Sequence, residues 1–300
     1  MPRWTQSLRR WSCRPGRCRR APSGSRCSAI GSAITSRARH ARRAATTAPE
    51  AAAATPCFFV VGHGRSGTTY LARLLHAAEN ALVLHEPEQA DNYAAHLARL
   101  DSAAADEYVA NYRGQIVLRR QAESDHELYG EVNSHLRLHA KSLRSFFPAA
   151  QFLVLERELH EVVRSMMSRN LWMLYGLLRR KPAIADDDPA LRTIDFRRLL
   201  RDEPEIARLA LATWYVLHDK KAYRDVACSV LRFERLVREP GYVARHVLEP
   251  LGLRLSRAKA GAVDRAENAT TSHKMPPWQD WTARQRGVFE SVVRSMPDTA

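Results

Sequence analysis

The sequence predicts an α/β fold in three layers, with a P-loop-like parallel sheet flanked by helices. Short apolar segments of strand length alternate with segments whose apolar residues recur at helical spacing. Such alternation favours parallel strands joined by helices. The first apolar segment, Cys57–Val61, leads through a glycine-rich loop directly into a helical segment. This order of strand, loop and helix is the strongest single indication of the fold.

Five short apolar runs have the length of buried strands. They are residues 57–61, 81–84, 128–132, 151–156 and 226–233. Helical spacing of apolar residues predicts helices in most of the remaining chain. The expected helical segments are residues 68–78, 89–121, 136–147, 159–169, 170–225, 241–251 and 281–296, with breaks at 181–182 and 186–189.

The positive charge of the chain is concentrated at its N-terminus. The formal net charge is +15, but residues 1–49 hold 12 of the 47 basic residues and no acidic ones. The remaining 35 basic residues face 32 acidic ones, so the rest of the chain is close to neutral. We expect a disordered Arg-rich tail at 1–55 and one α/β domain at 56–300. A targeting peptide, an arm that binds nucleic acid or a membrane surface, and a mis-assigned start are the alternatives for the tail.

The five cysteines are scattered and odd in number, so they predict no disulfide framework and no zinc site. The sequence has no apolar run long enough to cross a membrane and no clear secretory segment. We therefore expect a soluble, cytoplasmic enzyme that needs no metal.

The loop after the first strand has the composition of a phosphate-binding loop. It reads GHGRSGTT from Gly62 to Thr69. Glycines let the backbone approach an anion closely, and a helix start offers free N–H groups and a positive dipole end. The residues expected to bind a phosphate-type group are Gly64, Arg65, Ser66, Gly67, Thr68 and Thr69.

The loop also differs from nucleoside-triphosphate P-loops. Its glycine spacing matches their pattern, and Thr69 occupies the Ser/Thr position. Thr68 stands where they have lysine, and the loop's cation is Arg65. This favours a site for one 5′-phosphate and a transferable anionic group. An ordinary glycine-rich turn between a strand and a helix is the alternative.

A second motif follows the fourth expected strand. Arg157 stands where that strand ends, Ser165 lies eight residues later, and Arg169 lies one helical turn further. Ligands in open α/β sheets bind at this edge, so all three residues could face one anion. Alternatively, Arg157 pairs with Glu158 or Glu161 on a solvated helix face.

Together, the two motifs resemble those of sulfotransferases that use 3′-phosphoadenosine 5′-phosphosulfate. The resemblance covers about residues 57–255. It implies that the loop binds the 5′-phosphosulfate and that Arg157 and Ser165 bind the 3′-phosphate. The segment at 231–253 resembles the family's Y-E-x-L-x-x-x-P…L-G pattern, with Phe233 in place of the tyrosine.

The resemblance also suggests residues for the chemistry. In many relatives the general base is a glutamate at the end of the second strand, and Glu86 lies there, 21 residues after Arg65. Glu131 is the second candidate, although Val132 replaces a lysine common in relatives. Arg65 is expected to stabilise charge on the transferred group. His85 and His135 are further candidates by residue type.

Two other classes of protein compete with the sulfotransferase. A P-loop kinase of a small molecule would need the lysine that Thr68 replaces. A nucleic-acid-binding protein would act through the basic tail, because the rest of the chain is nearly neutral. For the sulfotransferase, the acceptor is a hydroxyl of a sugar, lipid, phenol or tyrosine. Its pocket is expected from residues 88–125 and 170–205, and Lys274 could close over the donor.

Overall fold

A computed structural model describes residues 48–168, 188–255 and 275–297 of the chain. The chain divides at residue 45, and all of the elements described belong to the unit of residues 46–300. Arg169 and Lys274 lie outside the described residues, as do residues 170–187 of the helical segment expected at 170–225.

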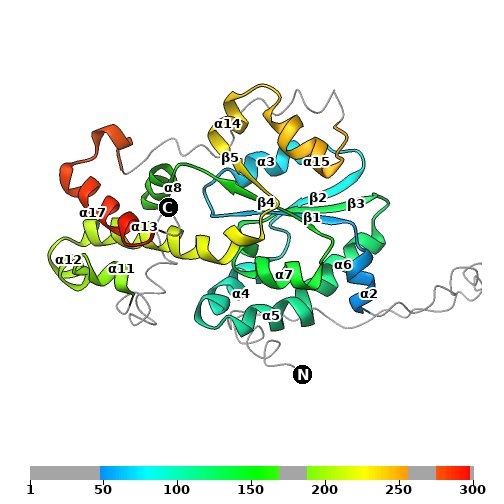
Figure 1. The fold of residues 1–300 in the computed structure, drawn as a ribbon, viewed down its shortest axis with the longest axis horizontal. Helices are drawn as coiled ribbons and strands as arrows, with labels where there is room; N and C mark the ends of the chain where they lie inside the picture. The colour runs from blue at the N-terminus through cyan, green and yellow to red at the C-terminus, as the bar shows by residue number, and fades with distance from the viewer. Residues whose placement is uncertain (1–47, 169–187, 256–274, 298–300) are drawn as a thin grey trace, which may run out of the picture. The chain divides into compact units, whose positions relative to one another are not determined.

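The described part of this unit contains one five-stranded sheet in which every pairing is parallel. The strand order is β2-β3-β1-β4-β5, so the first strand is the central one. This confirms the predicted fold class (Figure 1). The strands are β1 (Cys57–Gly62), β2 (Ala81–His85), β3 (Leu128–Val132), β4 (Gln151–Glu156) and β5 (Ser229–Arg232).

Strand β1 is central because both of its faces are apolar. All six of its residues are buried. Phe58 and Val60 belong to the hydrophobic core on one face of the sheet, whereas Phe59 and Val61 belong to the core on the other face. A strand that is apolar on both faces requires helices on both sides, which gives the three layers.

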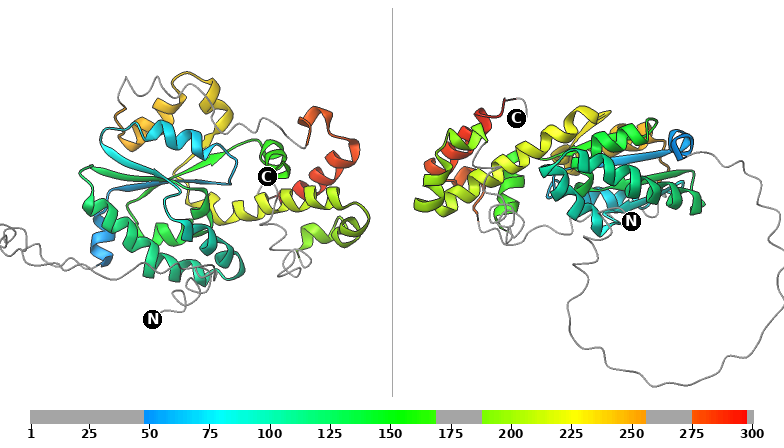
Figure 2. Two further views of the ribbon diagram at one scale, coloured as in Figure 1. Left: turned by 180° about the vertical axis from the view of Figure 1, so that it is seen from behind. Right: turned by 90° about the horizontal axis from the view of Figure 1, so that it is seen from below.

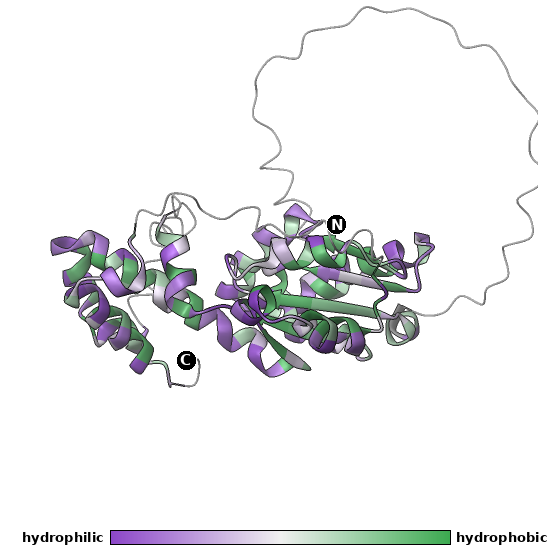
Figure 3. Cartoon of the chain, turned by 90° about the horizontal axis from the view of Figure 1, so that it is seen from above, coloured by the Kyte–Doolittle hydropathy of each residue, from purple (hydrophilic) through white to green (hydrophobic). Residues whose placement is uncertain are grey.

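Helices cover each face, as Figures 1 and 2 show. The first core packs beneath α3 (Thr68–Leu75), α14 (Phe233–Arg238), η4 (Ala244–Leu248) and α15 (Glu249–Leu251). The opposite face carries α2 (Ala48–Ala54), α4 (Gln89–Leu100), α5 (Ala103–Tyr108), η1 (Val109–Arg113), α6 (Gly114–Glu123), η2 (Ser134–His139) and α7 (Ala140–Phe146). The hydropathy colouring of Figure 3 draws much of the sheet in the green of hydrophobic residues.

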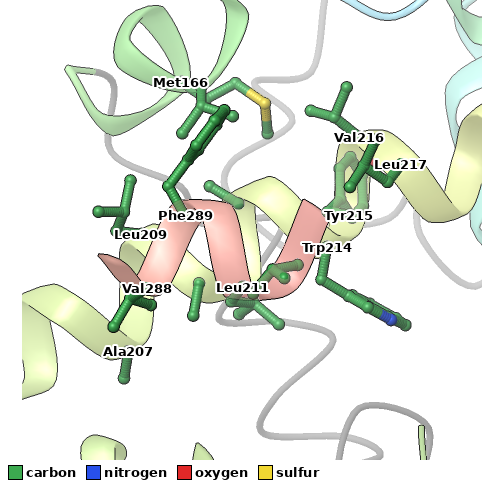
Figure 4. Packing of buried hydrophobic residues seen from close by; sticks show 14 of the residues in the cluster. Met166, Ala207, Leu209, Leu211, Trp214, Tyr215, Val216, Leu217, Val288 and Phe289 are labelled. Atoms are coloured by element: carbon green, nitrogen blue, oxygen red, sulfur yellow. The ribbon is translucent and has the colours of Figure 1, made fainter. Parts of the chain in front are cut away.

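A third core forms around the 20-residue helix α13 (Pro204–Tyr223). Helix α13 packs against α8 (Leu159–Met167), α12 (Phe196–Asp202) and α17 (Ala283–Arg294). In Figure 4, Met166 of α8 and Phe289 of α17 meet beside Leu209. The remaining described elements are α11 (Pro189–Arg192), η3 (Arg224–Val226) and η6 (Trp278–Asp280).

The structure corrects the expected boundaries of the tail and of the last strand. The sequence predicts a tail up to residue 55, but α2 occupies Ala48–Ala54 and buries Ala52 to 1% exposure. The run of alanines supplies a helix with one small apolar face, which sequence composition alone does not distinguish from a disordered segment. The last strand was expected at 226–233, but it is limited to Ser229–Arg232, because η3 precedes it and α14 begins at Phe233.

Gly62, at the end of β1, provides a test of this packing. A Cβ at this position would lie 2.4 Å from the backbone oxygen of Leu155 in β4. We expect Gly62→Ala to lower the free energy of unfolding by about 1–3 kcal/mol, because the neighbouring backbone must move. Urea denaturation of both proteins measures the difference. The control is Gly287→Ala in α17, where a Cβ meets no atom within 4 Å and alanine favours the helix. An equal loss in both variants would contradict this account.

Candidate active site

The loop from Gly62 to Thr68 lies at the carboxyl end of the central strand. Two of its residues, Arg65 (φ 80°) and Gly67 (φ 97°), adopt left-handed backbone conformations. The position of Gly67 also leaves no room for a side chain, because a Cβ there would lie 2.2 Å from the Phe233 ring. The loop is held together by the Ser66 amide, which donates to the His63 carbonyl at 3.2 Å.

This geometry can hold an anion. Helix α3 begins at Thr68, and the first turn of a helix has amide groups without intrahelical partners. Those amides and the helix dipole favour a phosphate-type group above the loop. Gly64, Ser66 and Thr69 belong to the same turn of chain, so the structure brings the predicted loop residues together.

The two sequence motifs meet at Arg65. Its Nε donates a hydrogen bond to Ser165 Oγ in α8 at 2.9 Å, across 100 residues of sequence. Arg157, which follows β4, donates from Nη1 to the backbone oxygen of Arg65 at 3.4 Å. Ser165 is only 2% exposed. The loop cation and two of the three residues of the second motif therefore form one cluster.

Arg157 also makes the pairing considered as the alternative. Its Nη2 donates to Glu161 Oε2 at 3.1 Å, and its Nε lies 4.0 Å from Glu234 Oε1. The guanidinium lies over the Phe233 ring, 5.2 Å from the centroid. These contacts fix Arg157 beside the loop, and its side chain keeps 26% exposure.

Glu86 lies directly after β2 and approaches the loop from the other side. Its backbone is left-handed, with φ 45°. The Ser134 hydroxyl donates to Glu86 Oε1 at 2.5 Å, and His135 Nε2 lies 3.3 Å from Oε2. The Ser134 hydroxyl is also 3.7 Å from the position of a Cβ on Gly64. Ser134 therefore contacts Glu86 and lies close to the loop at Gly64.

The surroundings of Glu86 keep its carboxylate ionised. Burial raises the pKa, but hydrogen bonds from His135 and Ser134 and the charge of His135 outweigh burial and lower the pKa of Glu86 to about 2. A carboxylate held this firmly accepts a proton only weakly by itself. Proton transfer at this site would therefore involve His135 as well as Glu86.

Glu131, the second candidate base, is in a different environment. Its side chain is fully buried. Arg113 Nη2 donates to its Oε2 at 2.5 Å, and the Tyr129 hydroxyl donates to its Oε1. Asn133 donates to it at 3.1 Å. Glu131 belongs to β3 and has no exposed side-chain surface, so its surroundings favour a structural role over that of the base.

A second buried charge cluster was not expected from the sequence. Asp219 of α13 accepts from Arg137 Nε at 2.7 Å and from Arg99 Nε and Nη2 at 2.9 and 2.7 Å. These two cations outweigh burial and hold the pKa of Asp219 well below its usual range. Arg137 also donates to the Ser134 carbonyl at 2.6 Å, so the cluster positions the serine that binds Glu86. The residues are far apart in sequence, and no spacing could have linked them.

The described ranges contain no group of three or more His, Cys, Asp or Glu side chains placed to hold a metal ion. Within the same ranges, no helix is both long enough and apolar enough to span a bilayer.

Comparison with known proteins identifies the family of the chain. The model of the "Sulfotransferase family" matches residues 56–257. No curated protein matches the chain. Among solved structures, the chain is similar to the sulfotransferase domain from the Synechococcus PCC 7002 olefin synthase, with 15% identity and a TM-score of 0.38 over 81% of this chain and 94% of that one. It is also similar to the sulfotransferase domain from the curacin biosynthetic pathway, with 14% identity and a TM-score of 0.39 over 71% and 79% of the two chains.

The family match spans about two thirds of the sequence and includes the loop, Glu86, Arg157 and Ser165. The chain therefore belongs to the sulfotransferase family and is an enzyme that transfers sulfo groups.

The structural role of Glu131 can be tested by removing its charge. We expect Glu131→Gln to lower the free energy of unfolding by about 3 kcal/mol, because a buried ion pair loses one partner. Denaturant unfolding measures this loss. The control is Glu127→Gln, whose pair with Arg254 is mostly exposed and should contribute less than about 1 kcal/mol. Similar stability of both variants would exclude the structural role.

Proposed function

We propose that the enzyme transfers the sulfuryl group of 3′-phosphoadenosine 5′-phosphosulfate to an acceptor hydroxyl. The observation that carries the proposal is the hydrogen bond between Arg65 and Ser165, which unites the loop with the second motif. One nucleotide carrying a 5′-phosphosulfate and a 3′-phosphate would occupy both parts of this cluster. The acceptor is a sugar, lipid, phenol or tyrosine that bears the hydroxyl.

The binding residues divide by their place in the fold. The loop amides and Arg65 would hold the 5′-phosphosulfate, with Gly64, Ser66, Gly67, Thr68 and Thr69 completing the cradle. Arg157 and Ser165 would hold the 3′-phosphate by charge and by a hydroxyl. We also assign Arg169 to this phosphate, on the sequence motif alone.

The reaction requires an acceptor oxygen to attack sulfur in line with the leaving phosphate oxygen, as in phosphoryl transfer. A bond from the acceptor oxygen to sulfur forms, and the bond from sulfur to the bridging oxygen breaks. The electron pair of that bond stays on the phosphate, and the acceptor's proton passes to a base. Arg65 stabilises the negative charge that develops on the bridging and sulfonate oxygens.

We propose that Glu86 and His135 act together as the base, with His135 taking up the proton. Glu86 follows β2 and accepts a hydrogen bond from Ser134, which lies next to the loop. The His135 imidazole is 3.3 Å from the carboxylate and is itself partly exposed, so it can receive the proton while Glu86 orients it. His135 supplies the proton acceptor, and the Glu86 carboxylate compensates the positive charge that His135 gains.

The rival functions have less support. A kinase would need a lysine at the position of Thr68 to reach the β- and γ-phosphates. Binding of nucleic acid by the folded unit would need a basic surface, and residues 50–300 are nearly neutral.

Nucleotide titration tests the donor. We expect the full-length protein to bind 3′,5′-adenosine bisphosphate with micromolar affinity in calorimetry. Arg157→Ala should weaken binding roughly tenfold to a hundredfold, because a charge-assisted contact with the 3′-phosphate is lost. The control is Arg245→Ala, which removes an exposed arginine paired with Glu239. Preference for ATP with Mg²⁺ over the bisphosphate would instead support the kinase.

Turnover tests the base. With an acceptor found by screening hydroxyl compounds, we expect Glu86→Gln to lower kcat about a hundredfold or more and to leave bisphosphate affinity unchanged. His135→Gln should lower kcat as well, because the two side chains act as one unit. Glu79→Gln, at an exposed glutamate just before β2 and outside the segments expected to form the acceptor pocket, is the control. Full turnover by Glu86→Gln would refute the assignment.

A further inference from the structure

A cavity lies beside the loop at the carboxyl ends of β4 and β5. The loop contributes His63 and Ser66 to its wall, Arg157 follows β4, and Arg232 ends β5. Helix α13 contributes Lys220 and Tyr223. The cavity therefore adjoins both the loop and the arginine proposed for the 3′-phosphate.

In this wall, His63 has a ring nitrogen that lacks a hydrogen-bond partner among the described residues. Its Nδ1 lies 2.8 Å from the Gly64 carbonyl oxygen. A carbonyl oxygen can only accept, so Nδ1 carries the hydrogen and Nε2 carries a lone pair. His63 is 4% exposed, and Nε2 is buried without a hydrogen-bond partner among the described residues.

The imidazole is also fixed and neutral. Its ring packs edge-on against Tyr215 of α13, with centroids 5.2 Å apart and an interplanar angle of 84°. Burial, assisted by the positive charge of Arg137, lowers the pKa of His63 to about 3, although Asp219 acts in the opposite direction. At neutral pH the ring is therefore an uncharged hydrogen-bond acceptor.

A buried acceptor without a partner destabilises the protein, and native structures contain few of them. A ligand that reached Nε2 from the cavity with an O–H or N–H group would remove this cost. The bound donor is such a ligand, if it extends into the cavity.

The in-line geometry of the reaction indicates which of the two substrates lies on the side of the cavity. Glu86 and Ser134 follow β2 and β3, on one side of the central strand, and the cavity follows β4 and β5, on the other side. In-line transfer places the acceptor and the leaving nucleotide on opposite sides of the transferred group. Because the acceptor approaches from the side of Glu86, the nucleotide extends toward the cavity.

We propose that His63 Nε2 accepts a hydrogen bond from the ribose 2′-hydroxyl of the donor nucleotide. This inference rests on the proposed function. The 2′-hydroxyl is the one free ribose hydroxyl of the nucleotide, and its carbon is adjacent to that of the 3′-phosphate. Arg157, assigned to that phosphate, lines the same cavity as His63. His63 thereby makes the site selective for a ribonucleotide over its 2′-deoxy analogue.

The test compares two ligands on matched variants of the full-length protein by calorimetry. The ligands are 3′,5′-adenosine bisphosphate and its 2′-deoxy analogue. Wild type should bind the analogue roughly tenfold more weakly, because the Nε2 acceptor then stays unpaired. His63→Leu and His63→Phe lack the acceptor and should bind both ligands equally. His63→Gln retains an acceptor at a similar position and should still prefer the ribonucleotide.

Each comparison is a ratio within one protein, so a general loss of affinity cancels, and melting temperatures identify which apolar variant is folded. Equal binding of both ligands by wild type would overturn the inference, as would undiminished preference in a folded apolar variant. In both cases the bisphosphate still binds, and the proposed function stands. If wild type bound neither ligand, the proposed function would fail and this inference with it.

Discussion

The site depends on one constraint, the burial of β1 on both faces and its pairing on both edges. A strand with Phe58 and Val60 in one core and Phe59 and Val61 in the other can occupy only the middle of a covered sheet. The carboxyl end of β1 then lies at the centre of the sheet edge where ligands bind in such folds. Strands β2 and β3 deliver Glu86 and Ser134 from one side, and β4 delivers Arg157 from the other.

Two buried charge clusters hold the chain between these strands. One joins Arg113 to Glu131 and Asp91 beneath β3, and the other joins Asp219 to Arg99 and Arg137 beside η2. They flank Asn133 to His135, the segment that contacts Glu86. Buried ion pairs add little net stability compared with apolar packing, because both charges lose water. Their directional bonds can instead fix where this short segment lies.

Much of the fold could be predicted from local patterns. The five strand positions follow from short apolar runs, and the anion loop follows from its glycines and the helix after it. The pairing of Arg65 with Ser165 was accessible only through the likeness to a family, because 100 residues separate them. The buried state of Glu131 was not predictable. Its neighbours in sequence, Gly130 and Val132, give no sign of Arg113, which approaches from η1. Likewise, the alanines of α2 resemble a tail until a core is present for Ala52 to enter.

Three described residues other than glycine have left-handed backbones, and two of them are Arg65 and Glu86. For such residues this conformation costs about 1–2 kcal/mol relative to the common helical one, and glycine avoids most of that cost. Selection for stability alone would therefore replace both side chains with glycine and lose the proposed loop cation and the proposed base. The strain is a free-energy cost carried permanently by the resting enzyme, so thermal stability and function are opposed at these two positions. An engineering effort that ranks variants by melting temperature would need to hold both residues fixed.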